Sequence, residues 1–392
     1  MKLLIIGASP YQYYLYEKVR ELGIEICSVD INPDSAMFKK SDYFKAIDIF
    51  DTDRVVEYAL EQNVDGAATI NIDQGMTAVS KIQEQLGLPH KSLSKIKSCI
   101  RKDLMRNEWD KIGVQNPEYK VFEEKKSATG YAKSLSYDSI VKPVDNAAKR
   151  GIHKIKINDS LTTEKIEDAF TNSKSGKIIV EEYIEGNLYF VPTYIFDDGS
   201  VVTSVIKQIY NENHVQIQYD APVTLEESVT KDIVNEAVKA VKTFGPGPYH
   251  TEVIYSETKG TVLVETSPRI SYATVALTRL IEGFDPVSQL LNDSLAELNL
   301  DPSLKRLEDC NFARLTHIQP DAGLRFNGVL NKQNLEDSIY EVTALVEKGH
   351  VVEEFKTNEN RLLYFVNYGE TVEKLEKHSS QIYSAILENS FY

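Results

Sequence analysis

Short apolar runs alternate with amphipathic segments over about the first 90 residues of the chain. The apolar runs predict strands at residues 3–6, 24–30, 44–48 and 66–70. The segments between them have helical spacing and predict helices near 11–22, 52–62 and 74–86. Strands that alternate with helices of this length form a parallel sheet with right-handed crossovers. The pattern therefore predicts an N-terminal α/β domain over residues 1–95.

From about residue 98 the pattern changes to fewer parallel units and more hairpins. It predicts helices near 99–112, 126–135 and 161–173, and strands at 119–122, 139–144, 152–157 and 177–184. Two hairpins follow, with turns at Asp198-Gly199 and Lys259-Gly260, where glycine accepts a positive φ. This second domain is expected to span residues 96–300.

The last region, residues 301–392, is expected to be a small α+β region. It contains the strand-like segments FARLTHIQP, YEVTALVEKGHVV and RLLYFVNYG, followed by a predicted helix from about Val372. Its short length and its close link to the preceding helices argue against an independent domain.

Composition excludes several classes of protein. The 392 residues carry 44 basic and 59 acidic side chains, a net charge of −15, which argues against a nucleic-acid-binding protein. Cys27, Cys99 and Cys310 are scattered and lack metal-ligand spacing, so reduced thiols are expected. Neither the N-terminus nor any later segment is apolar enough for a signal peptide or a membrane span. We therefore expect a cytoplasmic protein without membrane association.

The turn GASPYQ after the first strand, with Asp30 at the end of the second, invites a dinucleotide-binding interpretation. That fingerprint requires G-x-G-x-x-G, but only Gly7 is present, with Ser9 and Gln12 at the other two positions. A tight turn without a nicotinamide cofactor is the favoured interpretation. A nicotinamide-dependent oxidoreductase is the less favoured alternative.

The second hairpin carries the sharpest set of candidate residues. Glu265, Ser267 and Arg269 alternate along its second strand and exit, and Glu252 lies on its first strand. Residues two apart share one face, so the carboxylates are expected to converge and to need a cation between them. Mg²⁺ favours such oxygen ligands, and arginine matches the oxygens of a phosphoryl group. An exposed, merely charged hairpin is the alternative for this motif alone.

Two further segments suggest nucleotide binding. Lys142 lies near the end of a predicted buried strand and precedes a loop of small and basic residues ending at Gly151. A lysine in an apolar strand is costly without an anion, and phosphate is the obvious partner, although its head could also reach solvent. Glu181 and Glu182 end another apolar strand, where a carboxylate could accept from an exocyclic amine and the backbone of Ile184 could pair with a ring nitrogen. A strand leaving the core is the simpler interpretation of that segment alone.

In this order, the motifs resemble the ATP-grasp superfamily, and most closely its carboxylate-amine ligases and carbamoyl-phosphate-synthase-like branch. The resemblance covers nearly the whole chain and implies a pre-ATP-grasp domain, a two-subdomain ATP-grasp fold with a lid at about 117–186, and a C-terminal region that completes the module. It also implies an ADP-forming ligase that activates a carboxylate as an acyl phosphate and joins it to an amine. Ammonia or bicarbonate is an alternative co-substrate. The oligomeric state is left open, and a homodimer is the form that the resemblance suggests.

The resemblance also implies roles for individual residues. Those matched to ATP binding are Lys102, Lys142, Glu181, Glu182, Ile184 and, more loosely, His214. Those matched to Mg²⁺, or to Mn²⁺ in its place, are Glu252, Glu265 and Ser267, and Arg269 matches the catalytic arginine.

Three positions depart from the family pattern. Ser267 replaces the usual Asn, Leu188 replaces a ribose-binding Glu, and the covering loop NAAKRG is poor in glycine. A nucleotide-binding sensor or scaffold without turnover is therefore kept as an alternative to an enzyme. The identity of the substrates is left open, because Tyr272 and Arg279 fit substrate contact and ordinary packing equally well.

Overall fold

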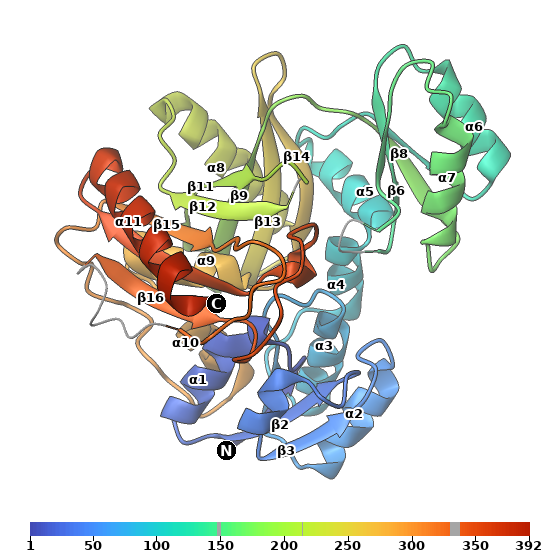
Figure 1. The fold of residues 1–392 in the computed structure, drawn as a ribbon. Helices are drawn as coiled ribbons and strands as arrows, with labels where there is room; N and C mark the ends of the chain where they lie inside the picture. The colour runs from blue at the N-terminus through green and yellow to red at the C-terminus, as the bar shows by residue number, and fades with distance from the viewer. Residues whose placement is uncertain (147–149, 214, 330–337) are drawn as a thin grey trace.

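The computed structural model describes residues 1–146, 150–213, 215–329 and 338–392. Its first sheet has four parallel strands in the order β3-β2-β1-β4 (Figure 1). These strands are β1 (Lys2–Ile6), β2 (Glu25–Asp30), β3 (Tyr43–Ala46) and β4 (Gly66–Ala68). The helices around them are α1 (Tyr13–Glu21), α2 (Thr52–Glu61) and α3 (Gly75–Gln85). The predicted parallel α/β unit is confirmed.

A small second sheet has four strands in the order β5-β8-β6-β7, all paired antiparallel. Its strands are β5 (Tyr119–Phe122), β6 (Ser139–Pro143), β7 (His153–Ile155) and β8 (Ile178–Glu182). Helices α6 (Lys125–Ser134) and α7 (Thr162–Thr171) pack on this sheet, with their own apolar core. We call this unit the small subdomain; in Figure 1 it stands at the upper right.

The third sheet has nine strands, with the main order β14-β13-β9-β11-β12-β15-β17-β16 and β10 paired to β9. The central part of the chain supplies β9 (Asn187–Ile195), β10 (Val201–Thr203), β11 (Ile206–Tyr210), β12 (Gln216–Ala221), β13 (Gly247–Ser256) and β14 (Gly260–Ser267). The last part supplies β15 (Phe312–His317), β16 (Ile339–Ala344) and β17 (Leu363–Gly369). The C-terminal strands therefore extend the central sheet.

Helices connect and cover these sheets. Two of them, α4 (Leu93–Ile100) and α5 (Lys102–Ile112), are separated at Arg101, where the chain is extended with φ −102° and ψ 116°. The helix predicted near 99–112 is confirmed as α5, although it begins at Lys102, and α4 was not predicted. The remaining helices are α8 (Glu227–Lys242), α9 (Tyr272–Glu282), α10 (Pro286–Ser294) and α11 (Val372–Ser390).

The largest apolar core joins the first sheet to the large one. Side chains of β1 and α1 pack with those of α9, α10, β15 and β17 in one buried cluster. Within the N-terminal unit, Gln12 is fully buried and hydrogen-bonds the backbone of Ile6 and Ile70. The N-terminal unit also meets the large sheet near the exit of β14, where the backbone N–H of Asn71 donates to the carbonyl of Ile270.

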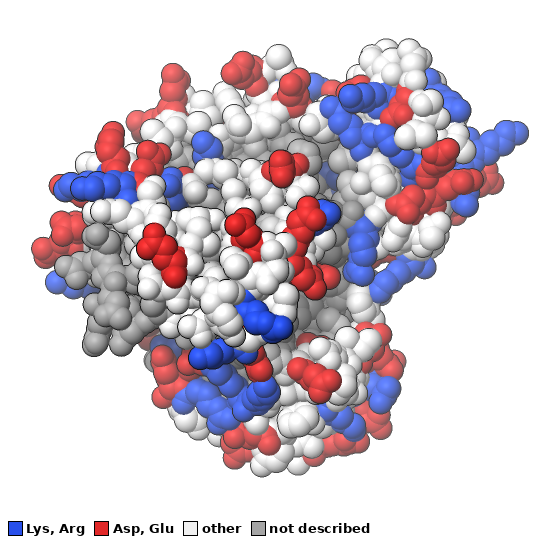
Figure 2. All heavy atoms as spheres, viewed as in Figure 1, with Lys and Arg blue, Asp and Glu red and all other residues white. Residues whose placement is uncertain are grey.

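Charged side chains of both signs are mixed over the face shown in Figure 2. Among the described residues, no helix is both long and apolar enough to cross a lipid bilayer.

Candidate active site

The β13–β14 hairpin brings the two predicted metal carboxylates together. Glu252 and Glu265 are directly opposite each other in the antiparallel register, and His250 is opposite Ser267. Opposed residues point to the same face of a sheet, so all four side chains share one surface. The register shifts immediately after Glu252, which marks a β-bulge beside the carboxylates.

Lys102 is buried at the start of α5 and lies against this pair. Its ammonium is 3.1 Å from Glu265 Oε2, and its backbone N–H donates to the carbonyl of Val144, which directly follows β6. Burial lowers the pKa of Lys102, but the adjacent Glu265 carboxylate raises it above its usual value. In return, Lys102 lowers the pKa of Glu265 to about 2. Both groups are therefore charged at neutral pH.

A second buried ion cluster links the small subdomain to α5. Glu181 on β8 is 1% exposed and accepts from Arg106 Nε at 2.9 Å and Lys142 Nζ at 2.6 Å. Burial raises the pKa of Glu181, but the Arg106 and Lys142 charges outweigh it and lower the value to about 2. Burial, with the charges of Arg106 and Lys102, lowers the pKa of Lys142. The two clusters together hold three cations, Lys102, Arg106 and Lys142, and two paired carboxylates, Glu181 and Glu265. This excess of positive charge suits a polyphosphate.

The segment predicted to hold adenine lies at the end of β8. Glu182 pairs with Lys259 from the turn of the β13–β14 hairpin. Ile184 is buried, and its backbone N–H has no hydrogen-bond acceptor among the described residues. The side chain of Glu181 forms ion pairs with Arg106 and Lys142. Its contact with adenine stays a prediction.

Arg269, at the exit of β14, contacts the N-terminal unit. Its Nε donates to Asp73 Oδ1 at 2.8 Å, while its Nη1 is buried without an acceptor among the described residues. Burial and the charge of Arg269 lower the pKa of His250 well below its usual range, so His250 is neutral. An orphaned guanidinium nitrogen at the exit of the strand that carries Glu265 is suited to an incoming anionic group.

The site fits Mg²⁺ bound together with substrate phosphates. The described residues contain no cluster of three or more His, Cys, Asp or Glu side chains able to hold a metal. The donor set is limited to Glu252, Glu265 and the buried Ser267. Mg²⁺ commonly uses one or two carboxylates and completes its shell with phosphate oxygens and water.

Some predicted positions lie outside the described residues. They are His214 and residues 147–149 of the covering loop.

Conversely, the sequence interpretation missed Arg106 and Asp73. The spacing from Lys102 to Arg106 places both on one face of α5 and could have indicated the first. Nothing local to Asp73 indicates a partner 196 residues away.

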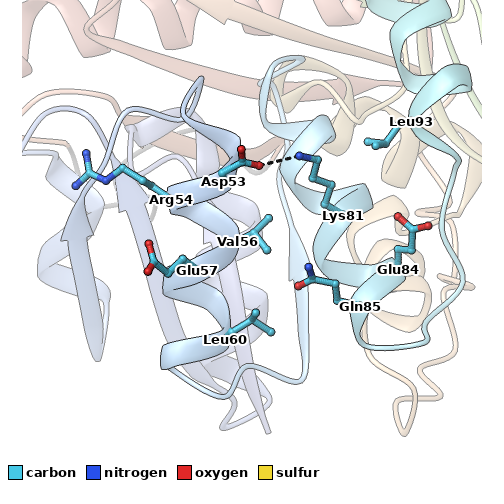
Figure 3. A pocket seen from close by; sticks show the side chains of 9 residues that line it. All are labelled: Asp53, Arg54, Val56, Glu57, Leu60, Lys81, Glu84, Gln85 and Leu93. Atoms are coloured by element: carbon cyan, nitrogen blue, oxygen red, sulfur yellow. Dashed lines mark hydrogen bonds and ion pairs between the residues drawn. The ribbon is translucent and has the colours of Figure 1, made fainter.

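Two surface pockets lie apart from this site. One, of about 680 Å³, lies between α2 and α3 and includes Leu60, Leu93 and the ion pair Asp53–Lys81 (Figure 3). Its Asp53 side chain is 90% exposed. The other is lined by residues of the segments 33–39 and 346–350, and by Phe44. Neither includes a residue predicted to bind nucleotide or metal.

Comparison with known proteins identifies the domain around this site. Residues 135–278 match the ATP-grasp domain family. A curated phosphoribosylamine–glycine ligase from Fusobacterium nucleatum is 23% identical over 269 residues, which cover 62% of this chain and 61% of that enzyme. The alignment thus spans about three fifths of the length of that relative.

Solved structures extend the similarity in fold to the whole chain. An L-amino acid ligase from Bacillus licheniformis has a TM-score of 0.78 and 19% identity, covering 100% of this chain and 97% of its own. The biotin carboxylase domain of a 2-oxoglutarate carboxylase from Hydrogenobacter thermophilus, in complex with MgADP and bicarbonate, has a TM-score of 0.76 and 16% identity. It covers 97% of this chain and 89% of its own.

Proposed function

Because residues 135–278 match the ATP-grasp domain family and the ATP-grasp fold extends over the whole chain, we propose that this protein is an ADP-forming ligase that joins a carboxylate to an amine. One observation carries the proposal: Glu252 and Glu265 are opposed on one hairpin, with Lys102 on Glu265 and Arg269 at the hairpin's exit. A carboxylate pair flanked by lysine and arginine supports phosphoryl transfer better than a structural role. MgATP is the proposed nucleotide.

The first step transfers the γ-phosphoryl group of ATP to the substrate carboxylate. A bond forms between the carboxylate oxygen and γ-phosphorus, the bond to the β,γ-bridging oxygen breaks, and ADP leaves. Lys102 and Lys142 would neutralise phosphate charge, and Arg269 would stabilise the transferring group. Glu252 and Glu265, with Ser267, would hold Mg²⁺, which supplies further neutralisation of phosphate charge when bound.

The second step forms the C–N bond. The amine attacks the acyl phosphate carbon, the C–O bond to phosphate breaks, and the amine loses a proton as the amide forms. Water would hydrolyse the acyl phosphate, so the reaction needs a closed site. We propose that the small subdomain, which carries Lys142 and Glu181, forms the lid.

An ADP-release screen over pairs of amino acids and small carboxylates tests the proposal. We expect ADP release with at least one pair, and loss of roughly 100-fold or more of the rate in Glu265→Gln, because a charged ligand is lost. Glu227→Gln on the exposed face of α8 is the matched control, since Glu227 is 82% exposed and pairs only with Lys231.

Binding of ATP without ADP release across the whole panel would instead favour a nucleotide-binding sensor. Ser267 in place of Asn is the feature that motivates this second candidate. Bicarbonate and ammonia belong in the panel as alternative co-substrates. A homodimer and a cytoplasmic location complete the proposal.

A further inference from the structure

A buried arginine on the large sheet is not accounted for by the proposed ATP and Mg²⁺ sites. Arg361 lies just before β17 and is 5% exposed. Its guanidinium donates to the hydroxyls of Tyr272 at 3.0 Å and Tyr219 at 3.2 Å, and to the backbone carbonyl of Gln216 at 2.8 Å. We call Arg361, Tyr11, Tyr219, Tyr272 and His317 the arginine cluster.

Five separate segments of the chain build this cluster. Tyr11 comes from the GASPYQ turn after β1, and its ring centroid is 4.7 Å from that of Tyr272 at the start of α9. Its hydroxyl donates to the carbonyl of Asn358, three residues before Arg361. The turn that first suggested a nicotinamide site thus contributes a side chain to the arginine cluster.

Arg361 is a cation without an anionic partner among the described residues. No described carboxylate lies within 4.0 Å of its guanidinium, and its Nε has no hydrogen-bond acceptor among the described residues. Burial and the Arg361 charge lower the pKa of His317 well below its usual range, so that ring is neutral. The described acceptors of this buried charge are neutral: two phenols, the backbone carbonyl of Gln216 and, at 3.5 Å, its side-chain amide oxygen. A buried charge without a counter-charge is costly, and an anion would offset this cost.

The arginine cluster and the carboxylate pair share one face of the large sheet. Glu252 is opposite Phe190, whose ring stacks on Tyr219 at 5.8 Å. Burial and, to a smaller extent, the Glu252 charge raise the pKa of Tyr210, which lies between the two sites on β11. Tyr272 is only three residues from Arg269. A molecule that reaches Glu252 and Arg269 therefore has the arginine cluster as a neighbour.

Polar groups on this face favour an anion over a neutral ligand. Gln208, opposite Tyr219 on the neighbouring strand, has a buried side-chain N–H₂ without an acceptor among the described residues. The orphaned atoms of Arg361, Arg269 and Gln208 are all donors. Gln216, which accepts from the guanidinium of Arg361, and the neighbouring Tyr11 are only half-buried, so both also reach solvent.

We propose that Arg361 binds a second anionic group of the ligase substrates, a carboxylate or phosphate remote from the carboxylate that is activated. The proposal rests on the proposed ligase function and adds a substrate class to it: small molecules with an anion at both ends, or an amine that itself carries an anion. The Nε of Arg361, which lacks an acceptor among the described residues, would donate to the anion, and the positive charge of the guanidinium suits a carboxylate or a phosphate.

The test compares Arg361→Met with wild type on matched substrate pairs. Each anionic amine or acid is assayed beside its neutral counterpart: an amino acid beside its amide, and an amino alcohol phosphate beside the free alcohol. In Arg361→Met we expect the KM for the anionic member to rise roughly 10- to 100-fold, the value of a charged hydrogen bond. The KM for ATP and the slow reaction of the neutral member should stay unchanged. Whichever anionic substrate, the amino acid or the amino alcohol phosphate, shows the larger rise in KM identifies the second anion as a carboxylate or a phosphate.

Equal losses with anionic and neutral members, or no change in either, would overturn the proposal. Arg54→Met, which removes an exposed guanidinium in the N-terminal unit, is the matched control and should behave as wild type. Since Arg361→Met removes several buried hydrogen bonds, Arg361→Lys serves where the first variant does not fold. It keeps the charge but loses the paired donors, so an intermediate rise in KM is expected.

A binding measurement separates this proposal from the proposed function. Inorganic phosphate and acetate are each titrated against wild type and Arg361→Lys while the unfolding temperature is followed in the absence of ATP. One of these anions should stabilise wild type and have a weaker effect on the variant. No ADP release from any pair would contradict the ligase function alone, whereas identical anion responses in both proteins would contradict the role of Arg361 alone.

Discussion

The most deeply buried charge in the candidate site is Arg106, which is 0% exposed. It binds Glu181 and the backbone carbonyl of Val264, joining the small subdomain to the catalytic hairpin. Arg106→Met leaves Glu181 with Lys142 alone, and removing one partner of a buried ion cluster costs about 3 kcal/mol or more in free energy of unfolding. Urea denaturation measures this loss.

The control for Arg106→Met is Lys231→Met on α8. Its ion pair with Glu227 is exposed, so the expected change is below about 1 kcal/mol. Equal changes in the two variants would show that Arg106 is not a structural link. Conversely, a stable Arg106→Met protein with weak ATP binding would assign it to the nucleotide alone.

Glu181 predicts how stability depends on pH. Its pKa is lowered in the folded protein from an ordinary 4.5 to about 2, so the folded state binds its proton more weakly than the unfolded chain. The stabilisation is complete above about pH 4.5 and is lost progressively as the pH falls towards 2. Between those values, the free energy of unfolding should fall less steeply in Glu181→Gln than in wild type, whereas the exposed control Glu227→Gln should follow wild type. Parallel curves for Glu181→Gln and wild type would refute the assignment.

At the scale of elements, hydrophobic periodicity predicted the parallel strands of the first sheet and the β13–β14 hairpin well. It missed α4 and placed the start of the next helix near residue 99, whereas the backbone breaks at Arg101 and α5 begins at Lys102. That break places Lys102 at a helix start, where its side chain meets Glu265 and its N–H meets Val144. Local pattern does not contain this information, since the break is stabilised by contacts with distant strands.

The candidate site shows the same division between local and distant information. Residues within one motif, such as Glu252, Glu265 and Arg269, were found from their spacing. Partners such as Arg106 and Asp73 were missed because each reaches a segment far along the chain. The predicted resemblance to ATP-grasp proteins is confirmed by the match over residues 135–278, whereas the domain bounds and the individual roles of the site residues stay predictions.

At the scale of the whole molecule, the N-terminal unit meets the catalytic strand through Asp73. Asp73 receives Arg269 Nε at 2.8 Å, and the neighbouring Asn71 N–H donates to the carbonyl of Ile270. The N-terminal unit therefore holds the arginine proposed to stabilise phosphoryl transfer, although it contributes no residue to the proposed metal or adenine sites. We infer that Asp73 is a positioning residue that acts through Arg269.

Asp73→Asn tests this link between the two units. The amide keeps the shape of the side chain but loses its charge, so Arg269 should be held less firmly and kcat should fall roughly 10- to 100-fold. The KM for ATP should stay within about twofold, because among the described residues no ion pair joins Asp73 to Lys102 or Lys142. Asp73→Glu should recover part of the rate because it restores the carboxylate. Asp53→Asn, whose ion pair with Lys81 is exposed on the same unit, is the control and should keep the wild-type kcat. A rise in the KM for ATP without loss of kcat would instead assign Asp73 to nucleotide binding, and a variant unfolded at the assay temperature would assign it to domain packing.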